Sequence, residues 1–116
     1  MDYQKVIDEI LKKEPTLTGT GLNTGKVYSE DPIPEQEFLI CIEWVDQKQK
    51  TKVINKKAGS SYGFKHLVEK YFRITRGYGR YISNGSVIAA LIYRGVPIKS
   101  YSDSPNIYAA LRKERM

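Results

Sequence analysis

The sequence has one cysteine, one histidine and no long hydrophobic run. Because Cys41 has no second cysteine to pair with, an intramolecular disulfide is excluded, which favours a reducing compartment. The longest apolar run, 87–93, has seven residues, whereas a membrane-spanning helix needs about 20. The first residues show no basic stretch followed by an apolar one, so no secretory signal is expected. These absences predict a cytoplasmic protein that does not cross a membrane.

The chemical groups on which most enzymes and metal sites depend are also scarce. His66 lies beside the apolar stripe of a predicted helix, and no cysteine pairs with it in sequence. Cys41 lies in an apolar segment that is expected to be core, where a thiol usually serves only as a small hydrophobic group. No cysteines and histidines have the spacing of metal ligands. The Gly-rich stretch 19–25 lacks the Gly-Lys-Ser/Thr ending of a phosphate loop. We therefore expect a non-catalytic protein without a metal or cofactor, and a small enzyme is the least favoured class.

Charge is unevenly distributed along the 116 residues. Residues 1–47 contain four basic and ten acidic residues, a net charge of −6, whereas residues 48–116 contain fifteen basic and three acidic ones, a net charge of +12. A segregation of this kind attracts polyanions and acidic protein surfaces. The alternative explanation is a general basic bias of the proteome.

The hydrophobic patterns predict a single α+β domain that spans residues 1–116. Helical periodicity is present at 2–13, 62–73 and 85–94, and a proline after Ser104 favours a fourth helix at 106–115. The third of these segments is apolar almost throughout, so we expect it to be a core helix. That composition argues against a helix-turn-helix, whose second helix needs polar side chains for base edges.

Alternating apolar residues predict a buried strand at 37–45, which would form an antiparallel hairpin with a second strand at 50–55. A third, edge strand is possible at 96–101. The stretch 15–36 is rich in Thr, Gly and Pro and is expected to be an irregular loop, with at most a short strand at 26–29. The expected architecture is therefore a small antiparallel sheet packed against three to four helices.

The segment 73–81 is the best candidate for a binding site because it combines arginine, glycine and tyrosine between two predicted helices. Arginine binds phosphate with two parallel donors, tyrosine rings stack on bases, and glycine lets the backbone approach a ligand. With the lysines of the preceding helix, the predicted binding residues are Lys65, Lys70, Arg73, Arg76, Tyr78, Arg80 and Tyr81. The alternative is a flexible connector whose tyrosines pack locally. A second group of lysines, at 48–57, is more typical of a solvated strand edge.

Three segments of the second half of the chain, at 61–69, 81–90 and 104–106, read SYGFKHLVE, YISNGSVIAA and SPN. In these segments the chain resembles small accessory proteins that are carried by phages, plasmids and related mobile elements, some of which are anti-CRISPR proteins. The resemblance implies an inhibitor of a host defence nuclease that occupies a nucleic-acid or ribonucleoprotein surface, such as that of a CRISPR effector. A DNA-binding transcriptional regulator of the element's own genes is the alternative.

Overall fold

The structure is a computed structural model that describes residues 2–101 and 103–113. Its helices are α1 (Tyr3–Lys13), α2 (Glu35–Gln47), α3 (Ser61–Arg76) and α4 (Asn84–Tyr93), with a 3-10 turn at Lys56–Ala58. Two short antiparallel sheets pair β1 (Leu17–Thr18) with β2 (Gly21–Leu22) and β3 (Ile98–Ser100) with β4 (Ile107–Ala109). The predicted α+β class is confirmed.

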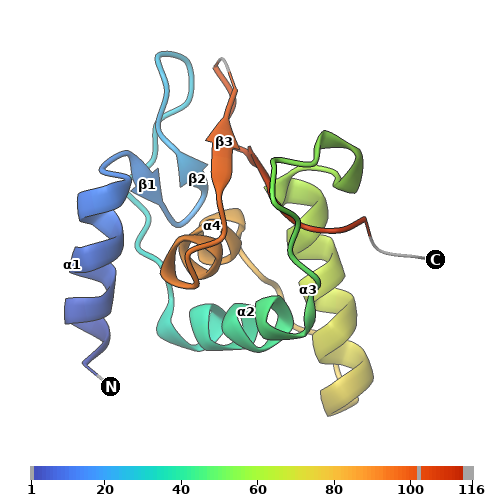
Figure 1. The fold of residues 1–116 in the computed structure, drawn as a ribbon. Helices are drawn as coiled ribbons and strands as arrows, with labels where there is room; N and C mark the ends of the chain where they lie inside the picture. Colours follow the sequence, from blue (N-terminus) through green and yellow to red (C-terminus); the bar gives the residue numbers. More distant parts are fainter. Residues whose placement is uncertain (1, 102, 114–116) are drawn as a thin grey trace.

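Helix α4 lies at the centre of the fold, with α1 on one side, α3 on the other and α2 beneath it in the view of Figure 1. Its residues 84–92 are all buried, and only Tyr93, at its end, is exposed. A helix that is apolar all round is stable only when other elements cover it on every side. The prediction of a core helix at 85–94 is therefore confirmed, and Gly95 ends the helix with a left-handed φ of 72°.

Helices α1 and α3 lie where the sequence predicts them. Asp2 caps α1, since its Oδ1 accepts a hydrogen bond from the Lys5 N–H at 3.3 Å. Helix α3 continues three residues beyond the predicted range 62–73 and ends at Gly77, which has a φ of 83°. Consequently Arg76 lies on the last turn of a helix and not in the connector.

The predicted hairpin of 37–45 and 50–55 is wrong. Residues 35–47 form helix α2, and residues 50–55 make only an isolated β-bridge, from Lys50 to Leu111. The alternation of Phe38, Ile40, Ile42 and Trp44 is compatible with a helix because Cys41 and Val45 are apolar too. These six side chains are buried mainly between α3 and α4, so α2 has apolar residues around most of its circumference.

The predicted helix at 106–115 is also wrong, although positions 114 and 115 lie outside the described residues. Residues 107–109 form β4, in which Ile107 and Ala109 are buried while Tyr108 is half-buried and lies opposite Lys99 of β3. The Ser61 hydroxyl accepts a hydrogen bond from the Ile107 N–H at 3.0 Å, which anchors β4 to the start of α3. Tertiary partners thus outweigh the local preference for a helix.

Of the remaining predicted strands, one is present in the structure and one is absent. The edge strand expected at 96–101 is present as β3, while the loop 15–36 contains β1 and β2 and no strand at 26–29.

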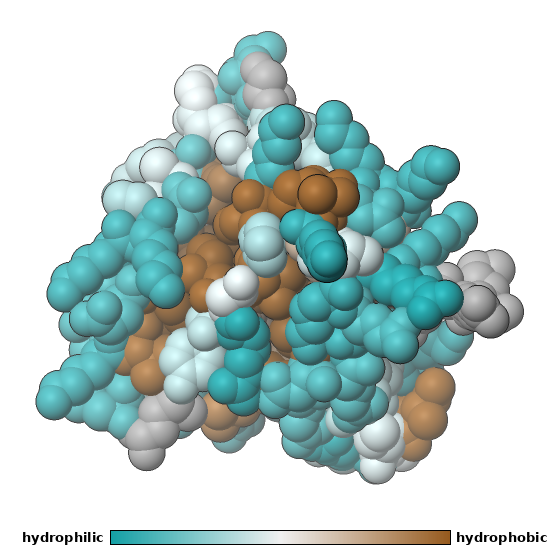
Figure 2. All heavy atoms as spheres, viewed as in Figure 1, coloured by the Kyte–Doolittle hydropathy of each residue, from teal (hydrophilic) through white to brown (hydrophobic). Residues whose placement is uncertain are grey.

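Most of the face drawn in Figure 2 is hydrophilic, with apolar atoms gathered in a band across its middle. Within residues 2–101 and 103–113, no helix is long and apolar enough to cross a membrane.

The junction between α4 and the β1–β2 turn leads to a stability prediction. A methyl group at Gly85 would lie 1.9 Å from the Thr18 carbonyl oxygen, whereas one at Gly63, on α3, would meet nothing within 4 Å. We expect Gly85→Ala to lower the free energy of unfolding by about 1–3 kcal/mol, because the turn must move. Gly63→Ala is the matched control and should raise it by about 0.5–1 kcal/mol, since alanine favours the helix. Urea unfolding followed by circular dichroism measures both, and equal effects of the two substitutions would refute the tight junction.

Candidate functional site

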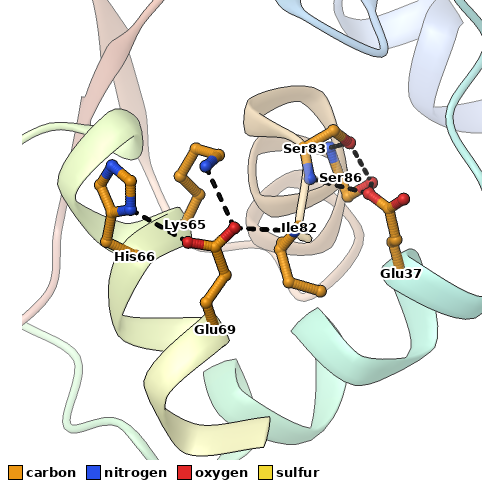
Figure 3. Close-up of polar contacts among 7 residues, drawn as sticks. All are labelled: Glu37, Lys65, His66, Glu69, Ile82, Ser83 and Ser86. Atoms are coloured by element: carbon orange, nitrogen blue, oxygen red, sulfur yellow. Dashed lines mark hydrogen bonds and ion pairs between the residues drawn. The ribbon is translucent and has the colours of Figure 1, made fainter. Parts of the chain in front are cut away.

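Two carboxylates hold the backbone of Ile82 and Ser83 from opposite sides (Figure 3). Glu37, on α2, accepts hydrogen bonds from the Ser83 N–H at 2.7 Å and from the Ser86 hydroxyl at 3.3 Å. Glu69, on α3, accepts one from the Ile82 N–H at 3.0 Å. The two helices thereby fix the end of the loop 77–83 just before α4 begins.

Glu69 also joins two cationic or titratable side chains of its own helix. Its Oε2 lies 3.2 Å from the Lys65 Nζ, and its Oε1 lies 3.0 Å from the His66 Nδ1. Burial alone would raise the pKa of Glu69, but the hydrogen bonds from the Ile82 N–H, Lys65 and His66 outweigh it and hold this pKa below its usual value. Glu69 is therefore the ionised centre of a small network that connects α3 to the loop.

Lys65 is a buried cation enclosed by aromatic rings. Its side chain is only 6% exposed, and its Nζ lies 4.6 Å from the Tyr81 ring centroid and 5.7 Å from that of Tyr62. A cavity of about 440 Å³ opens beside these side chains. We call this cavity the Lys65 pocket, and its lining residues are Thr20, Tyr62, Lys65, Tyr81, Asn84, Pro105 and Asn106.

Asn84 forms part of the pocket wall and has an unsatisfied oxygen. Its Nδ2 donates to the Asn106 Oδ1 at 2.8 Å, the Thr20 carbonyl at 3.3 Å and the Pro105 carbonyl at 3.4 Å. These three acceptors fix the orientation of the amide, because its oxygen cannot take the place of a donor. The opposite atom, Oδ1, is buried without a hydrogen-bond partner among the described residues. An acceptor in this state is unusual in a folded protein.

The structure brings Lys65 and Tyr81, two of the predicted binding residues, into one pocket, and it gives Arg76 a different role. The Arg76 guanidinium makes two hydrogen bonds to Glu43 of α2, at 2.7 and 2.9 Å. The same carboxylate accepts a hydrogen bond from the Tyr71 hydroxyl at 2.8 Å. The hydrogen bonds from Arg76 and Tyr71 lower the pKa of Glu43. Arg76 therefore connects α3 to α2 and is not free to bind phosphate.

The other predicted residues lie along the second half of α3 and in the loop that follows it, and Lys70 lines a cavity together with Trp44 and Gln47 of α2. Lys70 and Arg73 are exposed on the helix, and Tyr78 and Tyr81 are 62% and 65% exposed in the loop. The Tyr78 ring packs edge-on against Phe72, with centroids 5.2 Å apart, so local packing orients it without covering it. The Arg80 Nε is buried without a hydrogen-bond partner among the described residues. Lys70, Arg73 and Arg80 make no ion pair with a described residue. We call these five side chains the loop surface: Lys70, Arg73, Tyr78, Arg80 and Tyr81.

Sequence reasoning misses the polar pocket residues Thr20, Tyr62, Asn84 and Asn106. They come from the β1–β2 turn, the start of α3, the start of α4 and the segment before β4. Of these, only Tyr62 carries a signal in the sequence, since it lies three residues before Lys65 and thus on the same helix face. The other three reach the pocket only through contacts between distant parts of the chain.

The groups that nucleophilic chemistry would use lie in different surroundings. Cys41 is buried in α2, where burial raises the pKa of its thiol. His66 is exposed on α3 and makes an edge-on contact with Tyr62, with ring centroids 4.8 Å apart. In the described part of the chain, no group of three or more His, Cys, Asp or Glu residues is placed to hold a metal ion. What the arrangement offers is hydrogen-bond donors, cations and aromatic faces.

Comparison with known proteins does not identify a family. No protein-family model, curated protein or solved structure matches the chain significantly.

The Glu69 network leads to a prediction about stability and pH. Glu69→Gln leaves the buried Lys65 ammonium without its counter-charge, so we expect a loss of about 3 kcal/mol in the free energy of unfolding near neutral pH. Because folding lowers the pKa of Glu69, its ionised form stabilises the protein above the pKa of the unfolded chain. This stabilisation disappears as the pH falls through the folded-state pKa.

The difference between Glu69→Gln and the unaltered protein should therefore shrink as the solution is acidified, as urea unfolding at several pH values can measure. Glu43→Gln is the control, because it breaks an exposed ion pair and should cost no more than about 1 kcal/mol. Equal losses in the free energy of unfolding for the two variants would show that the burial of Lys65 adds nothing to the stabilisation by its ion pair with Glu69.

Proposed function

We propose that this protein binds nucleic acid without acting on it, and that the loop surface is its contact. The observation that supports the proposal is the combination on that surface of two exposed tyrosines with three cations that form no ion pair with a described residue. A cation without a neighbouring acid remains available to a phosphate, and releasing the counterions of the phosphates favours binding. An exposed tyrosine offers a face on which any base can stack.

The arrangement suits a single strand better than the major groove of a duplex. The loop surface lies at the end of α3 and in the loop after it, so its rings can meet bases that are already unstacked. Helix α4, the second helix of the pair, cannot serve as a recognition helix because residues 84–92 are buried. We therefore favour a binder of single strands over a helix-turn-helix regulator.

The biological setting that we propose follows from the resemblance to accessory proteins of mobile elements. The protein would inhibit a host defence nuclease by occupying the nucleic acid of a nucleoprotein complex. A stoichiometric complex with such a nuclease, together with loss of cleavage, would support this setting. Retardation of the element's own promoter DNA, with no effect on cleavage, would support a regulator instead.

The contact itself can be tested with the isolated protein and a fluorescently labelled single strand. We expect the double substitution Arg73→Ala/Arg80→Ala to weaken binding and to reduce the slope of log K against log salt concentration by about two, one for each lost phosphate contact. Tyr78→Ala should cost about 1–3 kcal/mol of binding free energy through lost stacking. Fluorescence anisotropy at several salt concentrations measures both effects.

Lys5→Ala/Lys13→Ala is the matched control. It also removes two positive charges, but from α1, which lies on the other side of α4 (Figure 1). The control should lower affinity only slightly and leave the tyrosine effect unchanged. If both double variants weaken binding equally, net charge alone drives association and the loop surface is not the contact.

A further inference from the structure

We propose that the Lys65 pocket binds one unpaired nucleobase that carries a keto oxygen next to a ring N–H, namely guanine, thymine or uracil. The inference rests on the proposed function, because it places one base of a bound strand at a defined site next to the loop surface. The cavity, at about 440 Å³, has the size of a small-ligand pocket. Tyr81 belongs both to this pocket and to the loop surface, so a strand that crosses the surface reaches the pocket directly.

The aromatic side chains of the pocket account for binding of a base but not for the choice of base. Tyr62 and Tyr81 are 55% and 65% exposed and come from α3 and from the loop after it. Neither hydroxyl makes a hydrogen bond to a described residue; the rings are placed by their contacts with Lys65 and, for Tyr62, with His66. Stacking on tyrosine tolerates every base, since each base has an aromatic face. Selection must come from the polar groups of the wall.

The first polar group is the Lys65 ammonium. It carries three N–H donors, of which Glu69 accepts one at 3.2 Å, and no other hydrogen bond joins it to a described residue. With the side chain 6% exposed, water has little access to the donors that remain. A keto oxygen, such as O6 of guanine or O4 of thymine and uracil, is an acceptor for them. The amino group of adenine or cytosine would instead place a donor against a donor.

The second polar group is the Asn84 Oδ1, the buried acceptor without a partner. The imide N–H beside the keto oxygen, at N1 of guanine or N3 of thymine and uracil, is a donor of the kind that this oxygen lacks. A base that enters the Lys65 pocket would have to reach this buried atom in order to supply that donor. Adenine and cytosine carry a lone pair at the corresponding ring nitrogen, which would repel the oxygen. Both polar groups therefore favour the same bases, and both disfavour the other two.

The decisive measurement compares labelled oligo-dT and oligo-dC of equal length by fluorescence anisotropy. Both are pyrimidine strands with the same backbone charge and similar stacking area, so a difference reports the polar edge of the base. We expect oligo-dT to bind at least roughly tenfold more tightly than oligo-dC. Tyr81→Ala should lower the affinity for both strands without reversing the preference for oligo-dT over oligo-dC.

The double substitution Lys65→Met/Glu69→Gln tests the donor. It removes the ion pair as a unit and leaves no uncompensated charge in the pocket, so the fold should survive, as thermal unfolding can verify. The variant should bind oligo-dT and oligo-dC within about twofold of each other. A folded variant that keeps the full preference would overturn the role of Lys65, and an unaltered protein that binds the two strands equally would overturn the inference without any variant.

A third arm separates this inference from the proposed function. Titration with dTMP and dCMP, followed through the tyrosine ring signals in NMR spectra, probes the pocket without a strand. If no oligonucleotide binds but dTMP shifts the signals of Tyr62 and Tyr81, the proposed function is wrong and the pocket serves a free nucleotide. If oligonucleotides bind without preference and dTMP shifts nothing, the loop surface binds nucleic acid and the pocket inference fails.

Discussion

The burial of the first turn of α4 is the constraint on which the rest of the structure depends. Water cannot satisfy N–H groups at a buried helix end, so protein atoms must do so. The Gly85 N–H donates to the Gly19 carbonyl at 3.1 Å, the Ser86 N–H to the Ser83 hydroxyl at 3.4 Å, and the preceding Ser83 N–H to Glu37. These acceptors belong to the β1–β2 turn, to the cap of the helix and to α2. The requirements of one helix end thus determine where two distant segments lie.

The same constraint builds the Lys65 pocket. The chain must enter α4 in an extended conformation at Ser83, and the Ile82 N–H just before it is held by Glu69. That hydrogen bond keeps Glu69 beside Lys65, while the docked β1–β2 turn brings Thr20 against Asn84. The hydrogen bonds that satisfy the buried start of α4 therefore also place the polar residues of the pocket. If the pocket binds a base as proposed, these hydrogen bonds would reduce the entropy lost on binding, because they already fix the side chains.

The sequence predicts those elements whose pattern has a single interpretation. Helices α1 and α3 each have one apolar stripe with a period of 3.6, and α4 lies between a serine cap and Gly95, so all three are found where expected. For α2 the pattern is ambiguous, because Phe38, Ile40 and Ile42 alternate as in a strand while Cys41 and Val45 complete a buried helix. For β4 the deciding factors are β3 and the Ser61 hydroxyl, which no local pattern reveals.

The candidate site, too, is only partly predictable from local sequence. Lys65 and Tyr81 stand out in the sequence by residue type, whereas Thr20 and Asn84 look like ordinary polar residues until the β1–β2 turn is docked. Whether a side chain is free for a partner is not visible in the sequence either. Arg76 has the same local setting as Arg73, yet only Arg76 reaches an acid on α2.

The fold itself uses part of the charge segregation between the two halves of the chain. Arg76 pairs with Glu43, and Arg94 pairs with Asp46 through two contacts at 2.8 and 3.0 Å. In both pairs an acid of the first half, on α2, meets an arginine of the second half, so part of the opposite charge joins α2 to α3 and α4. Exposed pairs of this kind contribute little to stability but help to select one arrangement of the helices over others. The positive charge that remains for a partner is therefore smaller than the +12 of residues 48–116. Part of that remainder lies at Lys70, Arg73 and Arg80, which make no ion pair with a described residue. Under the proposed function, this local lack of acidic partners favours an anion at the end of α3 more than the total charge does.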